Sequence, residues 1–296
     1  MRLKTALRDM MACHALRLLA MYLPWPVFFP LAKWLSRFEW LFRNETEAAW
    51  LVASQVLGVV DERGWKARCR LTRIVDQVDA FIAARASDSW VGRNVVVTGE
   101  WPDQACVAVT FHFGTGVWAL RHMRSSGRRN AFLSATVTRE AHAQRPCGYQ
   151  AELAHLKAVE EVGGASIVPV GGSIVKMSKL LREGISIVGL IDVPGVHAKH
   201  RATVHFLGHA ASFPTGLLFL AETEHAPLAV FTCKLDCASG KRVLNIHDAG
   251  PASPDRMQKV VDVLATAIVQ DSAVWHFWPN LQGLVESPLH PQDAPT

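Results

Sequence analysis

Cys106-Val-Ala-Val-Thr-Phe-His-Phe-Gly-Thr-Gly-Val-Trp-Ala-Leu-Arg121 is the stretch around which the chain is organised. Its apolar, β-prone start, Cys106 to Phe111, predicts a buried strand that ends at His112. Two glycines follow and a helix is expected after them. Open α/β folds build sites at the carboxyl ends of parallel strands, and glycine lets a ligand approach the backbone. His112 is therefore the first candidate functional residue; the alternative is a histidine satisfied within a tight turn.

The length and composition suit one large α/β domain with an N-terminal extension, because 296 residues can bury a sizeable core. The net charge is +5 and the pI is near 9.0, without a long basic stripe. This charge favours an anionic membrane surface or an acidic substrate over nucleic acid. The six cysteines include no CxxC pair. We expect reduced, buried thiols in a cytosolic compartment and no disulfides.

Residues 1–43 differ from the rest of the chain. Their apolar run, Leu18 to Ala32, holds three prolines and has cations on both sides and tryptophans after it. The run is too short and too kinked to span a bilayer. Aromatic residues beside cations at an apolar edge predict an interfacial, membrane-anchoring segment. A helical cap folded onto the domain's own core is the alternative, and the prolines disfavour a cleaved signal peptide.

Residues 44–92 are expected to form a helical cap of two amphipathic helices. The first keeps its apolar residues at helical spacing until Gly64, and the second does so from Leu71 to Ile82. We assign Asp76 and Asp79 to a solvated face of the second helix.

From residue 93 to 280 the pattern alternates between strands and helices, which predicts a mixed, largely parallel sheet covered by helices on both faces. Residues 281–296 are expected to form a loose tail. The expected strands are Val95–Thr98, Cys106–Phe111, Ala131–Ala135, Ile167–Val170, Ser186–Ile191, Val204–Leu207, Leu228–Lys234 and Val243–His247. The expected helices cover about 115–125, 149–162, 173–183, 214–223 and 254–270.

A second informative stretch is Gly189-Leu-Ile-Asp-Val-Pro-Gly195. Asp192 ends an apolar strand as His112 does, so the two side chains are expected to converge on one cleft. A carboxylate there needs a partner, either a histidine N–H or the amides of a turn that it caps. The basic loop Lys199 to Arg201 is a candidate phosphate contact, although such loops are usually only solvated.

A set of different short motifs occurs in a specific order from about residue 94 onward. They are Phe111-His112-Phe-Gly114, Asp192-x-Pro-Gly195, Phe206-Leu-Gly208-His-Ala-Ala-Ser-Phe-Pro-Thr-Gly216, Ala226-Pro227-Leu-Ala-Val-Phe231 and Trp275-His-Phe-Trp278. In this order the chain resembles the lipid A late acyltransferase (lauroyl/myristoyl transferase) branch of the bacterial lysophospholipid acyltransferase superfamily. The N-terminal segment fits the same resemblance.

The resemblance implies transfer of a fatty acyl group from acyl carrier protein or coenzyme A to a lipid hydroxyl, at the cytoplasmic face of the inner membrane. It implies His112 as the general base that takes the proton of the acceptor hydroxyl. No cofactor, metal or covalent acyl-enzyme is required. The candidate catalytic residues are His112 and, as site organiser, Asp192. The candidate substrate-binding residues are Gly114, Gly116, Arg139, Arg201, Gly208 and Thr215.

The chain departs from the family's H-x4-Asp/Glu motif, because Val117 stands where the carboxylate belongs. That carboxylate orients the histidine and stabilises its protonated form. Asp192 and Glu140 are the candidate substitutes. Otherwise His112 acts alone, or the protein is a catalytically silent lipid- or acyl-binding protein. The Gly114 and Gly116 amides remain candidates for an oxyanion or phosphate site.

Three other chemistries are less favoured. Gly114-x-Gly116-x-x-Ala119, with Glu140 about twenty residues on, fits a dinucleotide-binding oxidoreductase, but the fingerprint alone is weak. Four histidines, at positions 197, 200, 205 and 209, have spacings that do not converge on one zinc ion. There is no G-x-S-x-G elbow for a serine hydrolase.

Overall fold

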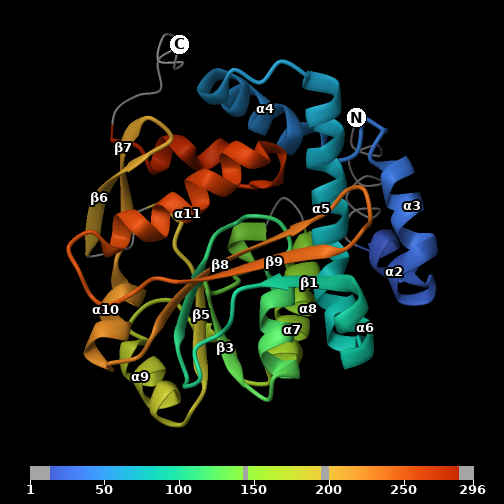
Figure 1. Cartoon of the computed structure of the whole chain (residues 1–296). Coiled ribbons are helices and arrows are strands. Elements are labelled where there is room, and N and C mark those ends of the chain that lie inside the picture. The colour runs from blue at the N-terminus through green and yellow to red at the C-terminus, as the bar shows by residue number, and fades with distance from the viewer. Residues whose placement is uncertain (1–13, 143–145, 195–199, 287–296) are drawn as a thin grey trace.

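A computed structural model of the chain describes residues 14–142, 146–194 and 200–286 (Figure 1). The central sheet consists of β1 (Val95–Thr98), β2 (Val107–Thr110), β3 (Asn130–Ser134), β4 (Val168–Pro169), β5 (Ser186–Leu190), β8 (Leu228–Leu235) and β9 (Arg242–Asp248). A separate hairpin consists of β6 (Arg201–Phe206) and β7 (His209–Pro214). The helices are α2 (Leu16–Tyr22), α3 (Trp25–Leu35), α4 (Arg43–Leu57), α5 (Glu62–Arg85), α6 (Asp88–Asn94), α7 (Val117–Ser125), α8 (Pro146–Gly163), α9 (Ile174–Arg182), α10 (Gly216–Thr223) and α11 (Arg256–Gln270).

The seven strands lie in the order β1-β9-β8-β2-β5-β3-β4. Every neighbouring pair is parallel except β8 and β9, which follow each other in the chain and pair antiparallel. Parallel neighbours need a long crossover, and helices supply it here. The strands β2 and β5 are neighbours inside the sheet, so their carboxyl ends meet away from either edge strand.

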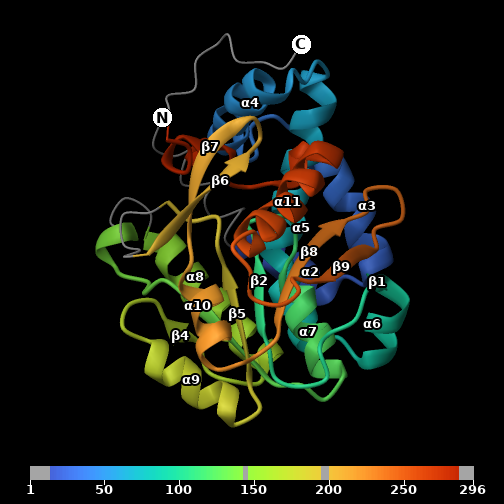
Figure 2. The ribbon, with the colours of Figure 1, turned by 60° about the vertical axis from the view of Figure 1, so that its left-hand side comes forward.

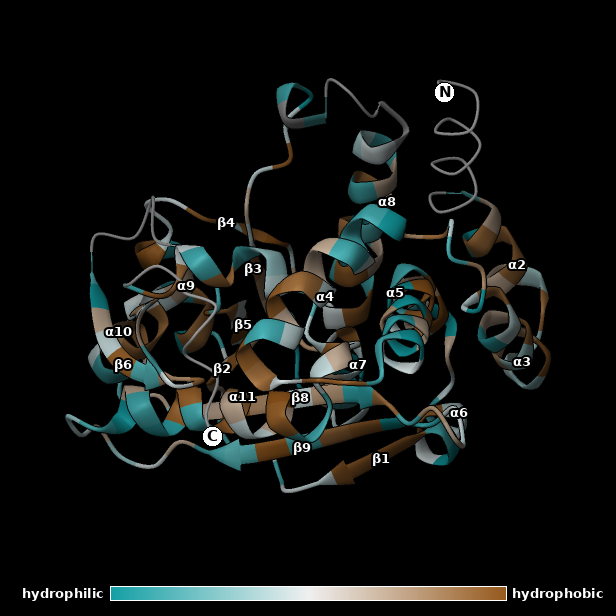
Figure 3. Ribbon diagram, turned by 90° about the horizontal axis from the view of Figure 1, so that it is seen from above, coloured by the Kyte–Doolittle hydropathy of each residue, from teal (hydrophilic) through white to brown (hydrophobic). Residues whose placement is uncertain are grey.

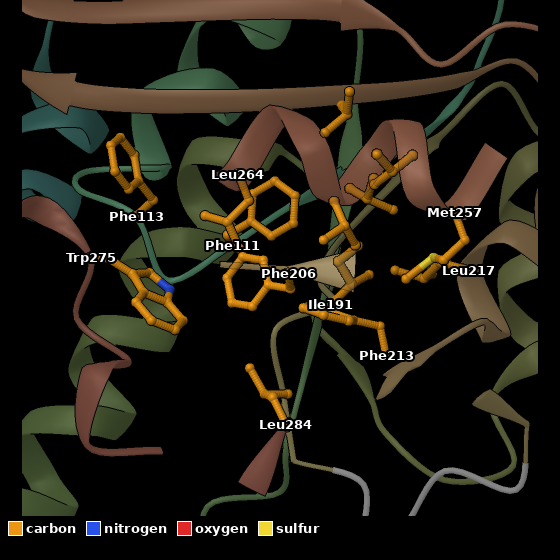
Figure 4. Packing of buried hydrophobic residues seen from close by; sticks show 14 of the residues in the cluster. Phe111, Phe113, Ile191, Phe206, Phe213, Leu217, Met257, Leu264, Trp275 and Leu284 are labelled. Carbon is orange, nitrogen blue, oxygen red and sulfur yellow. The ribbon is translucent and has the colours of Figure 1, made fainter. Parts of the chain in front are cut away.

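Helices cover both faces of the sheet (Figures 1 and 2). Successive side chains of a strand point to opposite faces, so Val107 and Val109 of β2 pack in one cluster and Ala108 packs in another. Residues of α9, α10 and α11 join the first cluster, part of which is drawn in Figure 4. Residues of α7 and α8 join the second. The predicted α/β architecture with a mixed, largely parallel sheet is confirmed.

The hairpin β6–β7 adds a strand that the sequence pattern does not predict. Leu207 and Gly208 form its tight turn with positive φ angles of 49° and 87°. The missed strand, β7, contains Ala210, Ala211 and Ser212, small residues without a strong preference for strands. Its pairing with β6 therefore depends on burial rather than on propensity.

The prediction of a loose tail over residues 281–296 is wrong for its first part. Leu281 and Leu284 are buried, and the amide of Ser212 donates a hydrogen bond of 2.7 Å to the Leu284 carbonyl. Residues 287–296 lie outside the described part of the chain. The apolar side chains of this segment pack against the hairpin, which extends the ordered domain to at least residue 286.

The N-terminal helices α2 and α3 pack against α5 at one edge of the molecule (Figure 3). Leu16, Phe28 and Ala32 are fully buried there. This burial agrees with the alternative interpretation of residues 1–43, a helical cap that packs on the domain's own core. The outer faces remain exposed, for example at Tyr22 (79%) and Trp34 (53%). No helix in the described ranges is long and apolar enough to cross a membrane. Residues 1–13, the start of the expected anchoring segment, lie outside those ranges.

The long helix α5 contacts α2, α3, α4, α7 and α8, so it lacks a broad solvated face. The prediction that Asp79 is solvated is wrong: its side chain is fully buried and pairs with the equally buried Arg242. The indole N–H of Trp118 donates to the same carboxylate at 2.7 Å. Two charges removed from water in this way hold α5 against β9 and α7.

Replacing Arg242 with Met should lower the free energy of unfolding by about 3–5 kcal/mol, because Asp79 would keep a buried charge without its cation. The double variant Asp79→Leu/Arg242→Met should be more stable than Arg242→Met alone. Urea denaturation measures both. Lys179→Met, which removes an exposed cation that faces Glu183, is the matched control and should have a much smaller effect. Equal losses for Arg242→Met and Lys179→Met would contradict the buried-pair argument.

Candidate active site

His112 and Asp192 lie side by side because their strands are neighbours in register. Thr110 of β2 pairs with Leu190 of β5, and each candidate residue follows two positions after its strand end. The side chains meet: His112 Nδ1 lies 2.8 Å from Asp192 Oδ1. The predicted convergence of these two residues is confirmed by this contact.

The hydrogen bonds of Asp192 determine which nitrogen of His112 carries the proton. The carboxylate accepts from the main-chain N–H of His112 at 2.9 and 3.1 Å and from the indole N–H of Trp275 at 2.8 Å. A carboxylate accepts but does not donate, so Nδ1 of the neutral imidazole must be the protonated nitrogen. Nε2 then has a free lone pair, on a side chain that is 30% exposed. This is the arrangement of a histidine base held by an acid.

The segment Trp275 to Phe277 contacts both the main chain and the ring of His112. The amide of His276 donates to the carbonyl of His112 at 2.8 Å. The ring of Phe277 stacks on the imidazole with 4.0 Å between centroids and 10° between planes. In the sequence this segment stands out only through the family resemblance. Its role depends on contacts with residues 83 or more positions away, for which the local pattern holds no signal.

Two opposing effects act on the pKa of His112. Burial disfavours the protonated ring, but the charge of Asp192, the hydrogen bond to Asp192 and the charge of Asp76 outweigh it. The pKa of His112 is therefore raised above 6.5. The imidazolium that forms when the base accepts a proton is stabilised by the same groups.

Asp76 of α5 is a third titratable group in this region. Burial and the nearby charge of Asp79 raise its pKa to about 7, against the opposing charges of Arg73 and His112. Its carboxylate lies 3.8 Å from Nε2 of His276. The pKa of His276 is held well below 6.5 by burial and by the charges of Arg73 and His112, although the Gly114 carbonyl opposes this. Near neutral pH His276 is thus uncharged and the carboxyl of Asp76 is about half ionised, so the two side chains do not form an ion pair.

The assignment of Asp76 to a solvated face is confirmed only in part: 37% of its side chain is exposed, but burial raises its pKa. Arg73 lies one helical turn before Asp76 and donates to the His276 carbonyl at 3.3 Å. The three-residue spacing of Arg73, Asp76 and Asp79 was the available signal, since it places all three on one side of α5.

The glycine turn after His112 is occupied by backbone contacts, which corrects the expected role of Gly114. Its amide donates to the Val274 carbonyl at 3.1 Å, and the Thr115 amide donates to the Cys233 carbonyl at 2.9 Å. Gly114 has a φ of +67°, and a Cβ there would lie 2.2 Å from the Cys233 carbonyl oxygen. Gly114 is required by the close approach of β8, not by a ligand, and its amide is not free for an oxyanion or a pyrophosphate.

Gly116 caps α7, and a Cβ there would meet only Phe231, at 3.9 Å. Val117 is partly buried and packs with the cluster beneath α7. The position of the family's motif carboxylate is thus filled by an apolar side chain. Asp192 contacts Nδ1 directly, whereas exposed Glu140 has no described hydrogen bond to His112. Of the two candidate substitutes, the structure selects Asp192.

The remaining expected substrate-binding residues do not gather at one place. Arg201 and Thr215 lie at the base of the hairpin, and Gly208 lies at its tip, about 17 Å away for a six-residue strand. Arg201 Nε donates to Ser212 Oγ at 2.8 Å. Arg139 follows β3 on an exposed loop, with its guanidinium 5.5 Å from the ring centroid of Tyr149.

No group of three or more His, Cys, Asp or Glu residues within the described ranges is arranged to hold a metal ion. Of the four clustered histidines, His197 lies outside those ranges, as does Lys199 of the basic loop. Cys69, Cys106, Cys233 and Cys237 are free thiols. Burial raises the pKa of Cys106 to about 11 and that of Cys233 to about 12, so neither is a reactive thiolate near neutral pH.

Asp192→Asn should lower the pKa of His112, because it removes the carboxylate charge that opposes the effect of burial. Titration of the His112 imidazole by NMR measures the shift and needs no substrate. The signals of His247, an exposed residue of β9 two strands away from β2, should be the same in both proteins. An unchanged or raised pKa of His112 in the variant would refute the pairing.

Asp76→Asn should change how stability depends on pH. A carboxyl with a folded pKa near 7 and an ordinary value of 3.8 stabilises the fold below pH 3.8, and that contribution is lost as pH rises to 7. The wild type should therefore lose stability relative to Asp76→Asn between about pH 4 and pH 7. Urea denaturation across this range provides the test. Parallel curves for the two proteins would show that Asp76 titrates normally.

Comparison with known proteins adds no assignment. No family model matches the chain, and no curated protein matches it. The candidate site is therefore defined by its own geometry. A histidine and an aspartate at the ends of neighbouring parallel strands are held together by direct hydrogen bonds and by the segment Trp275 to Phe277.

Proposed function

We propose that the protein is an acyltransferase that moves a fatty acyl group from an acyl thioester to a hydroxyl of a lipid or amphipathic acceptor. The observation that carries the proposal is the 2.8 Å contact between His112 Nδ1 and Asp192 Oδ1, which leaves Nε2 free as a general base. The motif order that resembles the lipid A late acyltransferases supports the same chemistry.

In the proposed reaction, His112 Nε2 takes the proton from the acceptor hydroxyl as its oxygen attacks the thioester carbonyl. A C–O bond forms, and the C–S bond then breaks as the tetrahedral intermediate collapses. The imidazolium returns its proton to the departing thiolate, so the histidine ends as it began. No acyl group is attached to the protein at any stage. The raised pKa of His112 favours the protonated intermediate state of the base.

Asp192 takes the part that the motif carboxylate plays in the similar family. It fixes the imidazole tautomer through Nδ1 and offsets the positive charge of the imidazolium. Loss of such an orienting carboxylate costs about 10⁴ in turnover in the serine-protease case. The substitution of the carboxylate by Val117 is thus compatible with activity, because the required contact comes from the neighbouring strand.

The proposed donors are acyl carrier protein and acyl-coenzyme A, and the proposed acceptor is a lipid at a membrane. We place the protein peripherally on the cytoplasmic face of the inner membrane. Two features support this location. Apolar side chains are exposed on α2 and α3, and the chain carries a net positive charge of +5, which attracts an anionic membrane. Nucleic acid is not among the proposed partners.

The experiment is acyl transfer by detergent-purified protein from mixed acyl thioesters into a bacterial lipid extract, read by mass spectrometry. Wild type should form an acylated lipid, His112→Gln should form none, and Asp192→Asn should be slower by about 10⁴. His247→Gln, which changes an exposed histidine of β9 two strands away from β2, is the matched control. The wild-type rate should rise with pH through the pKa of His112, above 6.5, because the base must be neutral.

Three results would count against the proposal. Equal product from wild type and His112→Gln would exclude His112 as the base. Free fatty acid without acylated lipid would indicate thioester hydrolysis, with water in place of the acceptor. No turnover with any donor would favour the second candidate, a catalytically silent lipid- or acyl-binding protein. The apolar Val117 at the motif position is the observation behind this candidate.

A further inference from the structure

A cleft of about 590 Å³ lies over α3, between that helix, the end of α6 and the turn that joins β8 to β9. It does not include His112 or Asp192, so the acyl-transfer proposal does not account for it. Its lining residues come from three separate parts of the chain. They are Trp25, Pro26, Phe29, Pro30, Lys33, Trp34, Arg37, Asn94, Ala238 and Ser239.

The lining combines an apolar floor with cations at one end. Trp25 and Phe29 are stacked with 5.4 Å between ring centroids and are mostly buried, so they form a firm aromatic surface. Lys33 lies on the exposed side of α3, and Arg37 lies exposed in the turn that follows the helix. The ammonium of Lys33 lies 5.5 Å from the centroid of the Phe29 ring. The described part of the lining contains no carboxylate.

The charges at this end are unpaired. Among the described residues, neither Lys33 nor Arg37 has an ion-pair or hydrogen-bond partner for its charged group. Cations that serve to stabilise the fold are usually paired, as Arg242 is with Asp79. Free cations beside an aromatic floor instead suit a ligand with an anionic head and an apolar body.

The surroundings of the cleft indicate where such a ligand comes from. Large apolar side chains stand exposed on α2, on α3 and just beyond α3. They are Leu18, Met21, Tyr22, Val27, Trp34 and Trp40. Tryptophan and tyrosine beside cations and exposed aliphatic residues are the composition of a surface that sits at the headgroup level of a bilayer. A soluble acidic protein would need more cations and less exposed apolar surface.

We propose that the α3 cleft binds one anionic phospholipid of the membrane on which the protein rests. Lys33 and Arg37 contact the headgroup phosphate, and the upper part of an acyl chain packs on Trp25, Phe29 and Trp34. This site is separate from the catalytic residues and serves to hold and orient the protein on an anionic bilayer. The inference does not depend on acyl transfer, because binding is measured without turnover.

The test begins with co-sedimentation of the full chain with vesicles of phosphatidylcholine alone or mixed with phosphatidylglycerol. Wild type should bind the mixed vesicles much more tightly. Lys33→Gln/Arg37→Gln should bind them about 25-fold more weakly, because each cation removed near an anionic surface lowers the affinity about fivefold. Lys179→Gln/Lys259→Gln removes the same charge from exposed positions on α9 and α11, and it should bind like wild type.

A second arm separates the cleft from general attraction to the surface. Dihexanoyl phosphatidylglycerol, kept below its micelle concentration, should bind saturably and change the tryptophan fluorescence. Ala238→Trp should abolish this binding while keeping every charge, because Ala238 is an exposed lining residue whose enlargement fills the cleft. Circular dichroism checks that each variant is folded. If Ala238→Trp does not fold, binding of the short-chain lipid by Lys33→Gln/Arg37→Gln tests the cleft instead.

Several results would overturn the inference. One is equal vesicle binding by wild type and Lys33→Gln/Arg37→Gln. Another is saturable lipid binding that survives in Ala238→Trp. Competition by inorganic phosphate at the same concentration as the lipid would show a site for free phosphate. Binding of acyl carrier protein, lost with Lys33 and Arg37 and independent of vesicles, would assign the surface to a protein partner. None of these results depends on whether His112 is a catalyst.

Discussion

The in-register pairing of β2 with β5 is the constraint on which the site depends. Parallel strands with aligned ends place the residues that follow them at equal height, so His112 and Asp192 come into direct contact. The pairing is buried on both faces by helices, which makes a shift of register costly. The geometry of the His112–Asp192 pair is thus set by two strands in the interior of the sheet.

Three carboxylates close to this core illustrate how burial decides the state of a charged group. Asp192 is fully buried but accepts hydrogen bonds from two N–H groups of His112 and from Trp275. Asp79 is fully buried and pairs with Arg242. Asp76 accepts no hydrogen bond from the described residues and has His276 Nε2 3.8 Å away, and burial raises its pKa to about 7. Burial also raises the pKa of Asp79, although the charge and hydrogen bonds of Arg242 and the hydrogen bond of Trp118 oppose it.

The C-terminal part of the chain completes the site from a distance. Trp275, His276 and Phe277 each touch His112 or Asp192, and the residues after them pack against the hairpin β6–β7. Phe206 of the hairpin lies 5.8 Å from Trp275, centroid to centroid (Figure 4). The hairpin, the C-terminal segment and the His112–Asp192 pair therefore form one packed unit. The glycine turn belongs to the same unit, because Gly114 is held against Val274 and Cys233.

The sequence by itself determined the α/β class, the seven sheet strands and the two strand-end residues His112 and Asp192. Hydrophobic runs and turn residues are local signals, so they report buried strands and where these end. They carry less information where small residues form a strand, as in β7, or where a helix is enclosed on most sides, as α5 is. Only the tertiary structure decided that Asp192, not a motif residue at position 117, orients His112. Only it showed that Asp79 is buried, that Gly114 serves packing and that Phe277 stacks on the imidazole. The physical reason is that these outcomes depend on desolvation and on contacts between distant segments, which exist only once the chain has folded.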